Sequence, residues 1–243
     1  MKSRAVIFSV SFVVAQPFET QGEHAAPLQM RARHALPLRN EGVHQVKVGI
    51  LAVQGDFAAH AAMLAGLDAE TVEVRTVHDL DGCDGLILPG GESTTQLQFL
   101  QEEGLFDAVK QFGASGGAIF GTCAGAILLA REVKHPAQAS LGLLDMTVLR
   151  NAYGRQLASD VFSGTNKLTD APMEMVFIRA PVIDRVGLGV EVLAEYGGKP
   201  VLVRRANVMA ATFHPELTQD SSVHRHFLEL VEAGRRSSAS VAR

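Results

Sequence analysis

The fold is decided by residues 118–131, which read AIFGTCAGAILLAR. The first three residues are apolar and predict a short buried strand, and the segment from Ala124 to Arg131 predicts a helix. Between them lies Gly-Thr-Cys-Ala-Gly, residues 121–125. A sharp strand-to-helix turn of this kind directs its central side chain out of the sheet, and flanking glycines let the backbone bend. The pattern therefore predicts a nucleophile elbow that presents Cys123 to a cleft.

The rest of the chain alternates between strand and helix patterns in the same way. Predicted strands cover residues 46–53, 72–75, 85–88, 118–120, 143–149, 175–178, 190–194, 201–204 and 208–213. Predicted helices cover residues 57–65, the segment that opens at 93, and residues 105–112, 124–131 and 222–233. Near-continuous apolar strands separated by helices indicate an α/β fold, a single three-layer domain with a mostly parallel central sheet flanked by helices.

Two helix starts carry capping signals. Asp56 directly precedes the first predicted helix and is a candidate N-cap residue. Ser93-Thr-Thr-Gln96 has the spacing of a capping box and predicts that Ser93 opens the next helix.

Composition excludes several classes of protein. Of 243 residues, 47% are hydrophobic and 20% charged, which argues against a disordered chain. A net charge of -4 leaves no basic excess for nucleic acid. The two cysteines, Cys83 and Cys123, exclude a disulfide framework and a cysteine-type metal site, and their scarcity fits a reducing compartment. No apolar run reaches the roughly 18 residues that a membrane span needs.

Three parts of the chain differ in pattern. Residues 1–45 contain three of the nine prolines and show no amphipathic period, so they predict a flexible or extraneous N-terminal extension. Within it, Lys2 and Arg4 precede an apolar stretch that resembles the start of a secretory signal, although the cleavage pattern is weak. Residues 46–233 are predicted to form the catalytic domain, and residues 234–243 a loose tail.

A cysteine nucleophile needs a base, and Phe213-His-Pro-Glu216 offers one after a predicted strand. Residues two apart on an extended segment point the same way, so Glu216 is predicted to orient His214 and to stabilise its cationic form. The competing interpretation of Cys123 is a small buried core residue, which is common for cysteine.

The remaining cysteine and histidines carry weaker signals. Cys83 is predicted to be structural, and His60 to be a core or surface residue of the first helix. His78 lies in a loop-like segment with no evident partner. The other histidines stand in polar or terminal contexts and are predicted to be at the surface: His24, His34, His44, His135, His224 and His226.

Glycines also follow the strand at 85–88, in Leu88-Pro-Gly-Gly-Glu-Ser93. Glycines between a strand end and a helix start expose backbone N–H groups, which suit a developing oxyanion. An ordinary strand-to-helix turn is the alternative. A phosphate loop is disfavoured because the Walker lysine is absent and the G-x-G-x-x-G spacing is not met.

Together these residues resemble the triad-type (class I) glutamine amidotransferases, and more narrowly the family of glutaminase subunits of pyridoxal 5'-phosphate synthases. Five motifs occur in order and carry the resemblance, which runs from about Val46 to about Ala233. They are Pro89-Gly-Gly-Glu-Ser-Thr-Thr95, Phe120-Gly-Thr-Cys-Ala-Gly125, Arg150-Asn-Ala-Tyr-Gly-Arg-Gln156, Phe177-Ile-Arg-Ala-Pro181 and Phe213-His-Pro-Glu-Leu217.

The resemblance implies a reaction and its partners. Glutamine is hydrolysed to glutamate and ammonia, and the ammonia passes to a barrel-type synthase subunit in a hetero-oligomer that makes the vitamin B6 cofactor. Family members of this kind are mostly silent until the synthase docks. The resemblance implies no cofactor and no metal in the glutaminase itself, a cytoplasmic location, and no nucleic-acid or membrane partner.

The resemblance also assigns roles to residues. Cys123 attacks the amide carbon, His214 moves protons and Glu216 orients it. The implied oxyanion donors are the backbone N–H groups of Gly91 and Ala124. The implied glutamine-binding residues are Gly91, Glu92, Ser93, Arg150, Ile178 and Arg179. A cation and an anion among them suit an amino acid, because Arg150 or Arg179 can pair with its carboxylate and Glu92 can face its ammonium. Arg155 and Arg185 are expected at the surface.

Two other interpretations remain open. One is a different elbow-cysteine hydrolase, such as a peptidase, or the glutaminase of another pathway. The other is a non-catalytic subunit that only binds a partner. One departure from the family concerns the first helix, where Ala59 precedes His60 in place of the usual acidic residue. It weakens detailed expectations about the docking surface and leaves the catalytic assignment unchanged.

Overall fold

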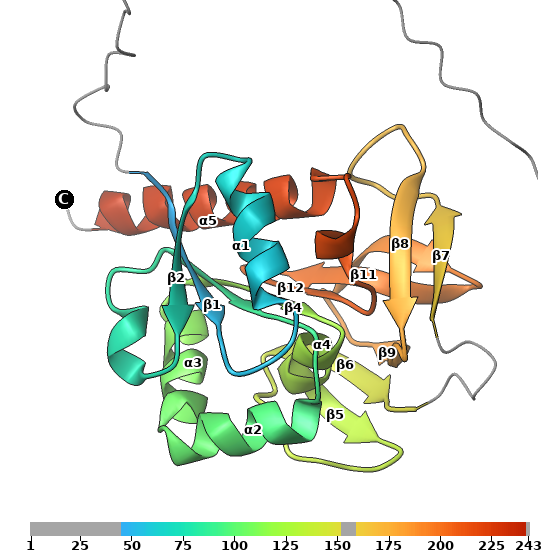
Figure 1. Cartoon of the computed structure of the whole chain (residues 1–243), viewed down its shortest axis with the longest axis horizontal. Coiled ribbons are helices and arrows are strands. Elements are labelled where there is room, and N and C mark those ends of the chain that lie inside the picture. The colour runs from blue at the N-terminus through green and yellow to red at the C-terminus, as the bar shows by residue number, and fades with distance from the viewer. Residues whose placement is uncertain (1–44, 152–158, 242–243) are drawn as a thin grey trace, which may run out of the picture. The chain divides into compact units, whose positions relative to one another are not determined.

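A seven-stranded sheet forms the middle layer, in the order β10-β11-β12-β4-β3-β1-β2 (Figure 1). The computed structural model describes residues 45–151 and 159–241. The parallel strands are β2 (Glu70–Val74), β1 (Lys47–Leu51), β3 (Gly85–Leu88), β4 (Ala118–Thr122) and β12 (Val208–Ala211). The antiparallel strands are β11 (Lys199–Arg205) and β10 (Glu191–Tyr196). The predicted α/β fold with a mostly parallel sheet is confirmed.

Helices cover both faces of this sheet. They are α1 (Phe57–Ala65), α2 (Ser93–Glu102), α3 (Leu105–Ala114), α4 (Ala124–Leu129) and α5 (Ser222–Val241). Alternation along each strand supplies apolar side chains to the two faces. Leu86 and Leu88 of β3 belong to the core formed with α2, α3 and α4, whereas Ile87 belongs to the core formed with α1 and α5. Helix α5 lies on the opposite side of the sheet from α2–α4 (Figure 1).

Two smaller sheets follow in the second half of the chain. One is three-stranded and consists of β5 (Ala130–Lys134), β6 (Leu144–Leu149) and β9 (Val182–Val186). The other is an antiparallel pair of β7 (Ser159–Gly164) and β8 (Met173–Ile178). Strands β5, β7 and β9 were not predicted. The apolar segment at 124–131 predicted one helix, but α4 ends at Leu129 and β5 begins at the next residue.

The C-terminal helix is longer than the sequence predicted. The expected helix ended near Ala233 and was followed by a loose tail, but α5 continues to Val241. Gly234 allows the helix to lie close to the carbonyl oxygen of Gly116, and Arg235 Nε lies 3.4 Å from Asp84 Oδ1. These contacts hold the helix beyond the glycine. Among the helices of the described residues, none has the length and apolarity needed to cross a membrane.

Helices α1 and α2 begin where the sequence predicted, after Asp56 and at Ser93, but neither is capped by the predicted side chain. Asp56 occupies the N-cap position of α1, but its side chain makes no capping hydrogen bond. At α2 the cap is Glu92, whose Oε1 accepts from the Thr94 N–H at 3.2 Å. Ser93 cannot cap the helix because its buried hydroxyl donates to Gln138 Oε1 at 3.0 Å. The predictions for residues 1–44 and 242–243 lie outside the described residues.

Helix α4 meets β3 without any space for a side chain at Gly125. A Cβ there would overlap the carbonyl oxygen of Leu88, which is backbone in a central strand. We therefore expect Gly125→Ala to lower the free energy of unfolding by about 3 kcal/mol, measured by urea denaturation.

The matched control is Gly66→Ala, at the C-cap of α1. Its backbone has an ordinary φ of -66°, and a Cβ would lie 3.4 Å from the nearest atom, the carbonyl oxygen of Met63. This variant should stay within about 1 kcal/mol of the wild type. Equal losses for the two variants would contradict the packing argument.

Candidate active site

Cys123 lies at the turn between β4 and α4 with φ 47° and ψ -99°. A positive φ is costly for a residue that has a Cβ, so the surrounding structure must hold it. The Cys123 N–H donates to the Ala211 carbonyl oxygen of β12 at 2.8 Å, and its own carbonyl accepts from the Ile127 N–H at 3.3 Å. The Sγ atom lies 3.8 Å from the Ile178 carbonyl oxygen. The strand–turn–helix geometry predicted for residues 118–131 is thus present.

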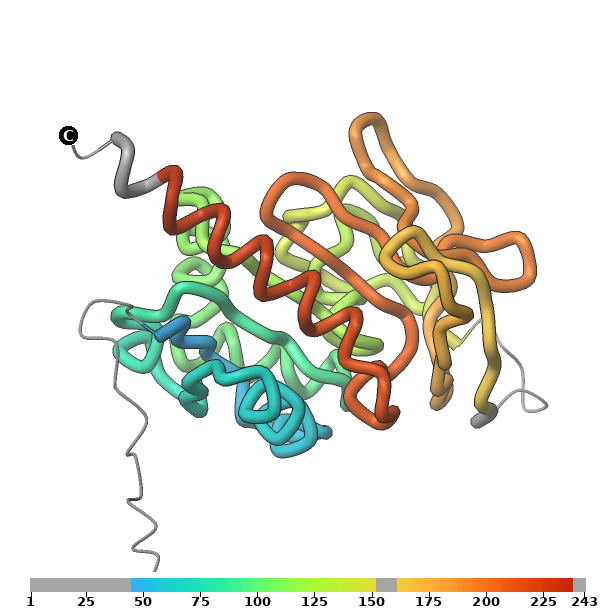
Figure 2. Tube along the Cα trace, turned by 90° about the horizontal axis from the view of Figure 1, so that it is seen from above, coloured from blue at the N-terminus to red at the C-terminus, as the bar shows by residue number. Residues whose placement is uncertain are grey.

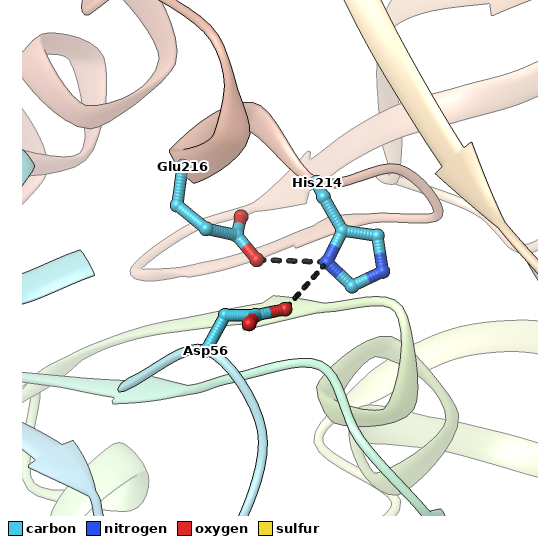
Figure 3. A group of neighbouring side chains, drawn as sticks. All are labelled: Asp56, His214 and Glu216. Carbon is cyan, nitrogen blue, oxygen red and sulfur yellow. Dashed lines mark hydrogen bonds and ion pairs between the residues drawn. The ribbon is translucent and has the colours of Figure 1, made fainter. Parts of the chain in front are cut away.

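His214 stands three residues beyond the end of β12. Its backbone N–H donates to the Val176 carbonyl oxygen at 2.8 Å, and its Nδ1 lies 2.8 Å from Glu216 Oε1 (Figure 3). The sequence predicted that an extended segment would align these side chains. Instead, the 3-10 turn η3 (Pro215–Leu217) brings Glu216 back to His214. The pairing was predicted, but for a different geometric reason.

A second carboxylate faces the same imidazole. Asp56 Oδ2 lies 3.7 Å from Nδ1 of His214, so the carboxylate that does not cap α1 points into the site (Figure 3). Asp56, His214 and Glu216 each offer a ligand atom within 4.8 Å of the others, which is close enough for a metal ion. A metal at Nδ1 would need that nitrogen without its proton. The 2.8 Å contact with Glu216 instead suits a protonated Nδ1 that donates to the carboxylate.

The charge state of His214 is set from two sides. Burial lowers its pKa, but hydrogen bonding and charge from Cys123 and Glu216 outweigh burial and raise the pKa to about 10. Burial also raises the pKa of Glu216, and His214 opposes that rise. Nε2 of His214 is buried and makes no hydrogen bond of regular geometry to the described residues. It is therefore the nitrogen that remains for the Cys123 thiol, and catalytic pairs of this kind commonly tighten only when substrate binds.

The loop after β3 is held by two glutamine side chains that the sequence did not single out. Gln96 Nε2 donates to the carbonyl oxygens of Pro89 and Gly90 at 3.1 and 3.3 Å. Gln54 Nε2 donates to the Glu92 carbonyl oxygen at 2.8 Å. Gly91, between these bonds, has φ 144°, a conformation that favours glycine. The available signal was Gln96 itself, a polar residue that α2 buries beside a glycine loop.

Glu92 and Arg150, two predicted substrate-binding residues, contact each other. Arg150 Nη2 donates to Glu92 Oε1 and to Thr94 Oγ1, both at 3.1 Å. The Arg150 side chain is only 13% exposed, so this is a partly buried ion pair. The fold therefore places a cation and an anion side by side at the start of α2, from segments far apart in the sequence.

The other predicted residues have different surroundings. Ile178 supplies the carbonyl oxygen near Cys123, and Ala124 is the buried first residue of α4. Arg179 is exposed and has φ 45°. Arg185 pairs with Asp145 and is exposed as predicted, with 3.2 Å between Nη2 and Oδ1. Arg155 lies outside the described residues.

The prediction that His224 lies at the surface is wrong. His224 and His60 are both fully buried, and their rings contact each other, with His60 Nδ1 2.9 Å from His224 Nε2. The missed signal is spacing: His224 stands three residues before Phe227 and seven before Val231, so it shares their buried face of α5. Cys83 is half-buried, and burial raises the pKa of its thiol, in keeping with the predicted structural role.

Comparison with known proteins gives a consistent result. Residues 50–233 match the SNO glutamine amidotransferase family. A relative from Koribacter versatilis is 51% identical over 189 residues, which are 78% of this chain and 97% of the relative. A relative from Thermus thermophilus is 53% identical over 186 residues, 75% of this chain and 96% of the relative. Both relatives are named pyridoxal 5'-phosphate synthase subunit PdxT.

Solved structures agree with the sequence matches. A crystal structure of a glutamine amidotransferase is 49% identical, with a TM-score of 0.72, over 76% of this chain and 98% of that one. The structure of PurLQS from Thermotoga maritima has a TM-score of 0.61 at 16% identity, over 76% of this chain and 99% of that one, and supports the fold alone.

Gly90 leaves no room for a side chain beside the His214 ring. A Cβ on Gly90 would overlap Cε1 of His214 and lie 3.0 Å from Nδ1. Because Gly90 lies in a loop, we expect Gly90→Ala to fold but to displace the imidazole, and to lower kcat for the reaction of Cys123 by at least about 100-fold. Thermal unfolding would show that the variant is folded. Steady-state kinetics would measure the decrease in kcat. Full activity in a folded variant would contradict the assignment.

The buried His224 predicts acid-sensitive stability. Burial lowers the pKa of His224 from 6.5 to about 4, so the ring is neutral in the folded protein. In the unfolded chain the ring takes up a proton as the pH falls below 6.5. The stabilisation is therefore present above pH 6.5 and is lost as the pH falls toward 4, and it amounts to about 3 kcal/mol.

The measurement is the difference in unfolding free energy between wild type and His224→Gln, taken by urea denaturation across this range. The wild type should lose stability relative to the variant as the pH falls. His226→Gln, a partly exposed histidine of the same helix that contacts Glu229, is the control and should follow the wild type. Parallel curves for wild type and His224→Gln would refute the assignment of a neutral ring.

Proposed function

We propose that this chain is the glutaminase subunit of a pyridoxal 5'-phosphate synthase. The chain belongs to the SNO glutamine amidotransferase family. It hydrolyses the side-chain amide of L-glutamine to L-glutamate and ammonia, and the ammonia is used to build pyridoxal 5'-phosphate. The observation that carries this function is the position of His214, on which Cys123 and Glu216 act together. A nucleophile, a base and an orienting carboxylate are the parts that amide hydrolysis through a covalent intermediate needs.

In the first step the Cys123 thiol passes its proton to His214, and the sulfur attacks the amide carbon of glutamine. A bond forms between sulfur and carbon, and the carbonyl oxygen takes up the electron pair as an oxyanion. His214, protonated and held by Glu216, then gives a proton to the departing nitrogen. The carbon–nitrogen bond breaks, ammonia leaves, and a thioester of Cys123 remains.

In the second step water replaces the nitrogen. His214 takes a proton from the attacking water, and the carbon–sulfur bond breaks to release glutamate. The sulfur regains its proton, so the enzyme returns to its starting state without any other reactant. The raised pKa of His214, about 10, fits this role because the protonated ring must survive in a buried site until the leaving group needs it.

The oxyanion is assigned to the backbone N–H groups of Gly91 and Ala124. Ala124 opens α4, so its N–H is one of the free donors that every helix start provides. Gly91 lies in the loop that Gln54 and Gln96 hold. Each donor of this kind contributes about 3 kcal/mol to lowering the barrier of acyl transfer.

Glutamine itself is assigned to Gly91, Glu92, Ser93, Arg150, Ile178 and Arg179. The ion pair of Glu92 and Arg150 supports this site, because the two charges can separate onto the ammonium and the carboxylate of a free amino acid. Bound glutamine would thus replace one ion pair by two. The two new pairs offset the free energy needed to separate Arg150 from Glu92.

The partner is a barrel-type synthase subunit in a hetero-oligomer, and the complex is cytoplasmic. The relatives that carry the name of a synthase subunit support a partner, since a subunit name implies an assembly. Ammonia is reactive and diffuses freely, so a glutaminase that feeds a second active site gains from docking directly onto it.

The test measures ammonia release from glutamine, with and without the synthase subunit, for wild type and Cys123→Ala. We expect Cys123→Ala to lose activity completely because no other residue can form the thioester. The matched control is Cys83→Ala, which removes the other cysteine and should retain activity within about twofold.

Three results would overturn the proposal. Ammonia release by Cys123→Ala at the wild-type rate would exclude the thioester mechanism. Cleavage of peptides in place of glutamine would indicate an elbow-cysteine peptidase. A mixture with synthase that makes pyridoxal 5'-phosphate equally well from Cys123→Ala and glutamine would exclude ammonia supply as the role of this chain.

A further inference from the structure

A row of buried polar side chains continues from Glu216 to the helices on one face of the sheet. His60 Nε2 of α1 lies 3.4 Å from Glu216 Oε2 and 3.2 Å from Thr122 Oγ1. His60 Nδ1 lies 2.9 Å from His224 Nε2 of α5. Helix α5 passes beside α1 (Figure 2), and the two histidines, one from each helix, both pack edge-on against Phe120 of β4. The catalytic mechanism derived above uses neither histidine.

The hydrogen bonds of this row determine where its protons lie. Nδ1 of His224 is buried and has no hydrogen-bond partner within residues 45–151 and 159–241. A proton there would be a buried donor without an acceptor, which is more costly than a bare lone pair. The proton of His224 therefore belongs on Nε2, from which it donates to His60 Nδ1. Because that nitrogen must then be bare, the proton of His60 lies on Nε2 and points toward Glu216 and Thr122.

The opposite tautomers are disfavoured at both ends. If His60 carried its proton on Nδ1, the bare Nε2 would face Glu216 Oε2 across 3.4 Å, and two lone-pair atoms would repel. His224 would then need its proton on the unpartnered Nδ1. The arrangement with both protons on Nε2 directs an N–H group at the Glu216 carboxylate. The opposite arrangement leaves a buried donor without an acceptor on His224 and a repulsion between His60 and Glu216.

Burial and the neighbouring titratable groups set the charges of this pair and of Glu216. Burial, followed by the charges of His224 and His214, lowers the pKa of His60 well below 6.5, and burial lowers that of His224, so both rings are neutral. Glu216 is faced by His214 and His60, and Asp56 adds a repulsive charge from the loop before α1. Since burial raises the pKa of Glu216, a neutral donor on Oε2 favours its ionised form without adding a second buried cation.

We propose that His60 and His224 are positioning residues that hold Glu216 ionised and aligned on His214 through a fixed pair of imidazole tautomers. The row then runs from His224 through His60 and Glu216 to His214. Glu216 Oε2 makes no hydrogen bond of regular geometry to the described residues, and the His60 Nε2 that faces it at 3.4 Å also bonds to Thr122 Oγ1. The inference that the row acts on catalysis rests on the proposed function, whereas the tautomers themselves do not.

The first measurement is independent of any substrate. Nitrogen-15 NMR of the imidazole rings distinguishes protonated from bare ring nitrogens in the full chain. We expect protonated Nε2 and bare Nδ1 in both His60 and His224. A proton on Nδ1 of His224 would overturn the proposal, even if the chain proves to be an active glutaminase.

The second measurement follows alkylation of Cys123 by iodoacetamide against pH, with mass spectrometry to separate it from Cys83. His60→Leu removes the donor to Glu216, and we expect the pH midpoint of Cys123 alkylation to rise by about half a unit or more. His60→Gln, whose amide can donate in place of Nε2, should restore the wild-type midpoint. Phe227→Leu is the packing control, because Phe227 packs against the same Phe120 ring as His224 and carries no charge.

The same variants are then assayed with glutamine. We expect His60→Leu to lower kcat by about tenfold with little change in KM, and His60→Gln to recover most of it. An unmoved alkylation midpoint in His60→Leu, or an equal shift in Phe227→Leu, would overturn the proposal and leave the glutaminase assignment intact. A wild type that releases no ammonia even with the synthase subunit present would instead refute the proposed function, while the NMR result would stand by itself.

Discussion

Where helix α4 crosses strand β3, Gly125 lies so close to the carbonyl oxygen of Leu88 that no side chain fits between them. This contact fixes the start of α4, and with it the strained backbone of Cys123. The same strand leads directly into the loop that carries Gly91. The contact between Gly125 and Leu88 therefore positions both the Cys123 sulfur, on one side, and the loop that carries Gly91, on the other. The other catalytic groups, His214 and Glu216, follow β12, the strand that pairs with β4 on its other side.

The sequence was sufficient for the parts of the fold whose apolar pattern is regular. The strands near residues 47–51 and 85–88 are continuous apolar runs, and both were predicted within a few residues. Strands β7 and β9 are short and carry charged residues, such as Asp160 and Asp184, so the apolar periodicity gave no signal there. The abrupt change from α4 to β5 was missed because the apolar pattern continues across it.

Pairs within the site were predictable when the residues are near in sequence, as for His214 and Glu216. Contacts between distant segments were not. The pairing of Arg150 with Glu92 spans 58 positions, and that of His60 with His224 spans 164. Asp56 looked like a helix cap because its local context is that of a cap, but tertiary structure turned its carboxylate to His214 instead. Local sequence patterns predict which chemical groups are available, and the topology of the sheet determines which of these groups come into contact.

The hairpin of β7 and β8 has a consequence for how this protein tolerates changes in length. The carbonyl groups of Val176 and Ile178 both point to the catalytic pair, one to the His214 N–H and the other to the Cys123 sulfur. Alternate residues of a strand share an edge, so the intervening carbonyl, at position 177, faces the other way. A single insertion inside β8 would exchange the two edges and leave both contacts without an acceptor. Extra residues between positions 165 and 172, in the connection between the two strands, would leave the register unchanged. Added length in that connection is therefore better tolerated than in the strand, provided that Asn166 and Lys167 keep their backbone contacts with β10.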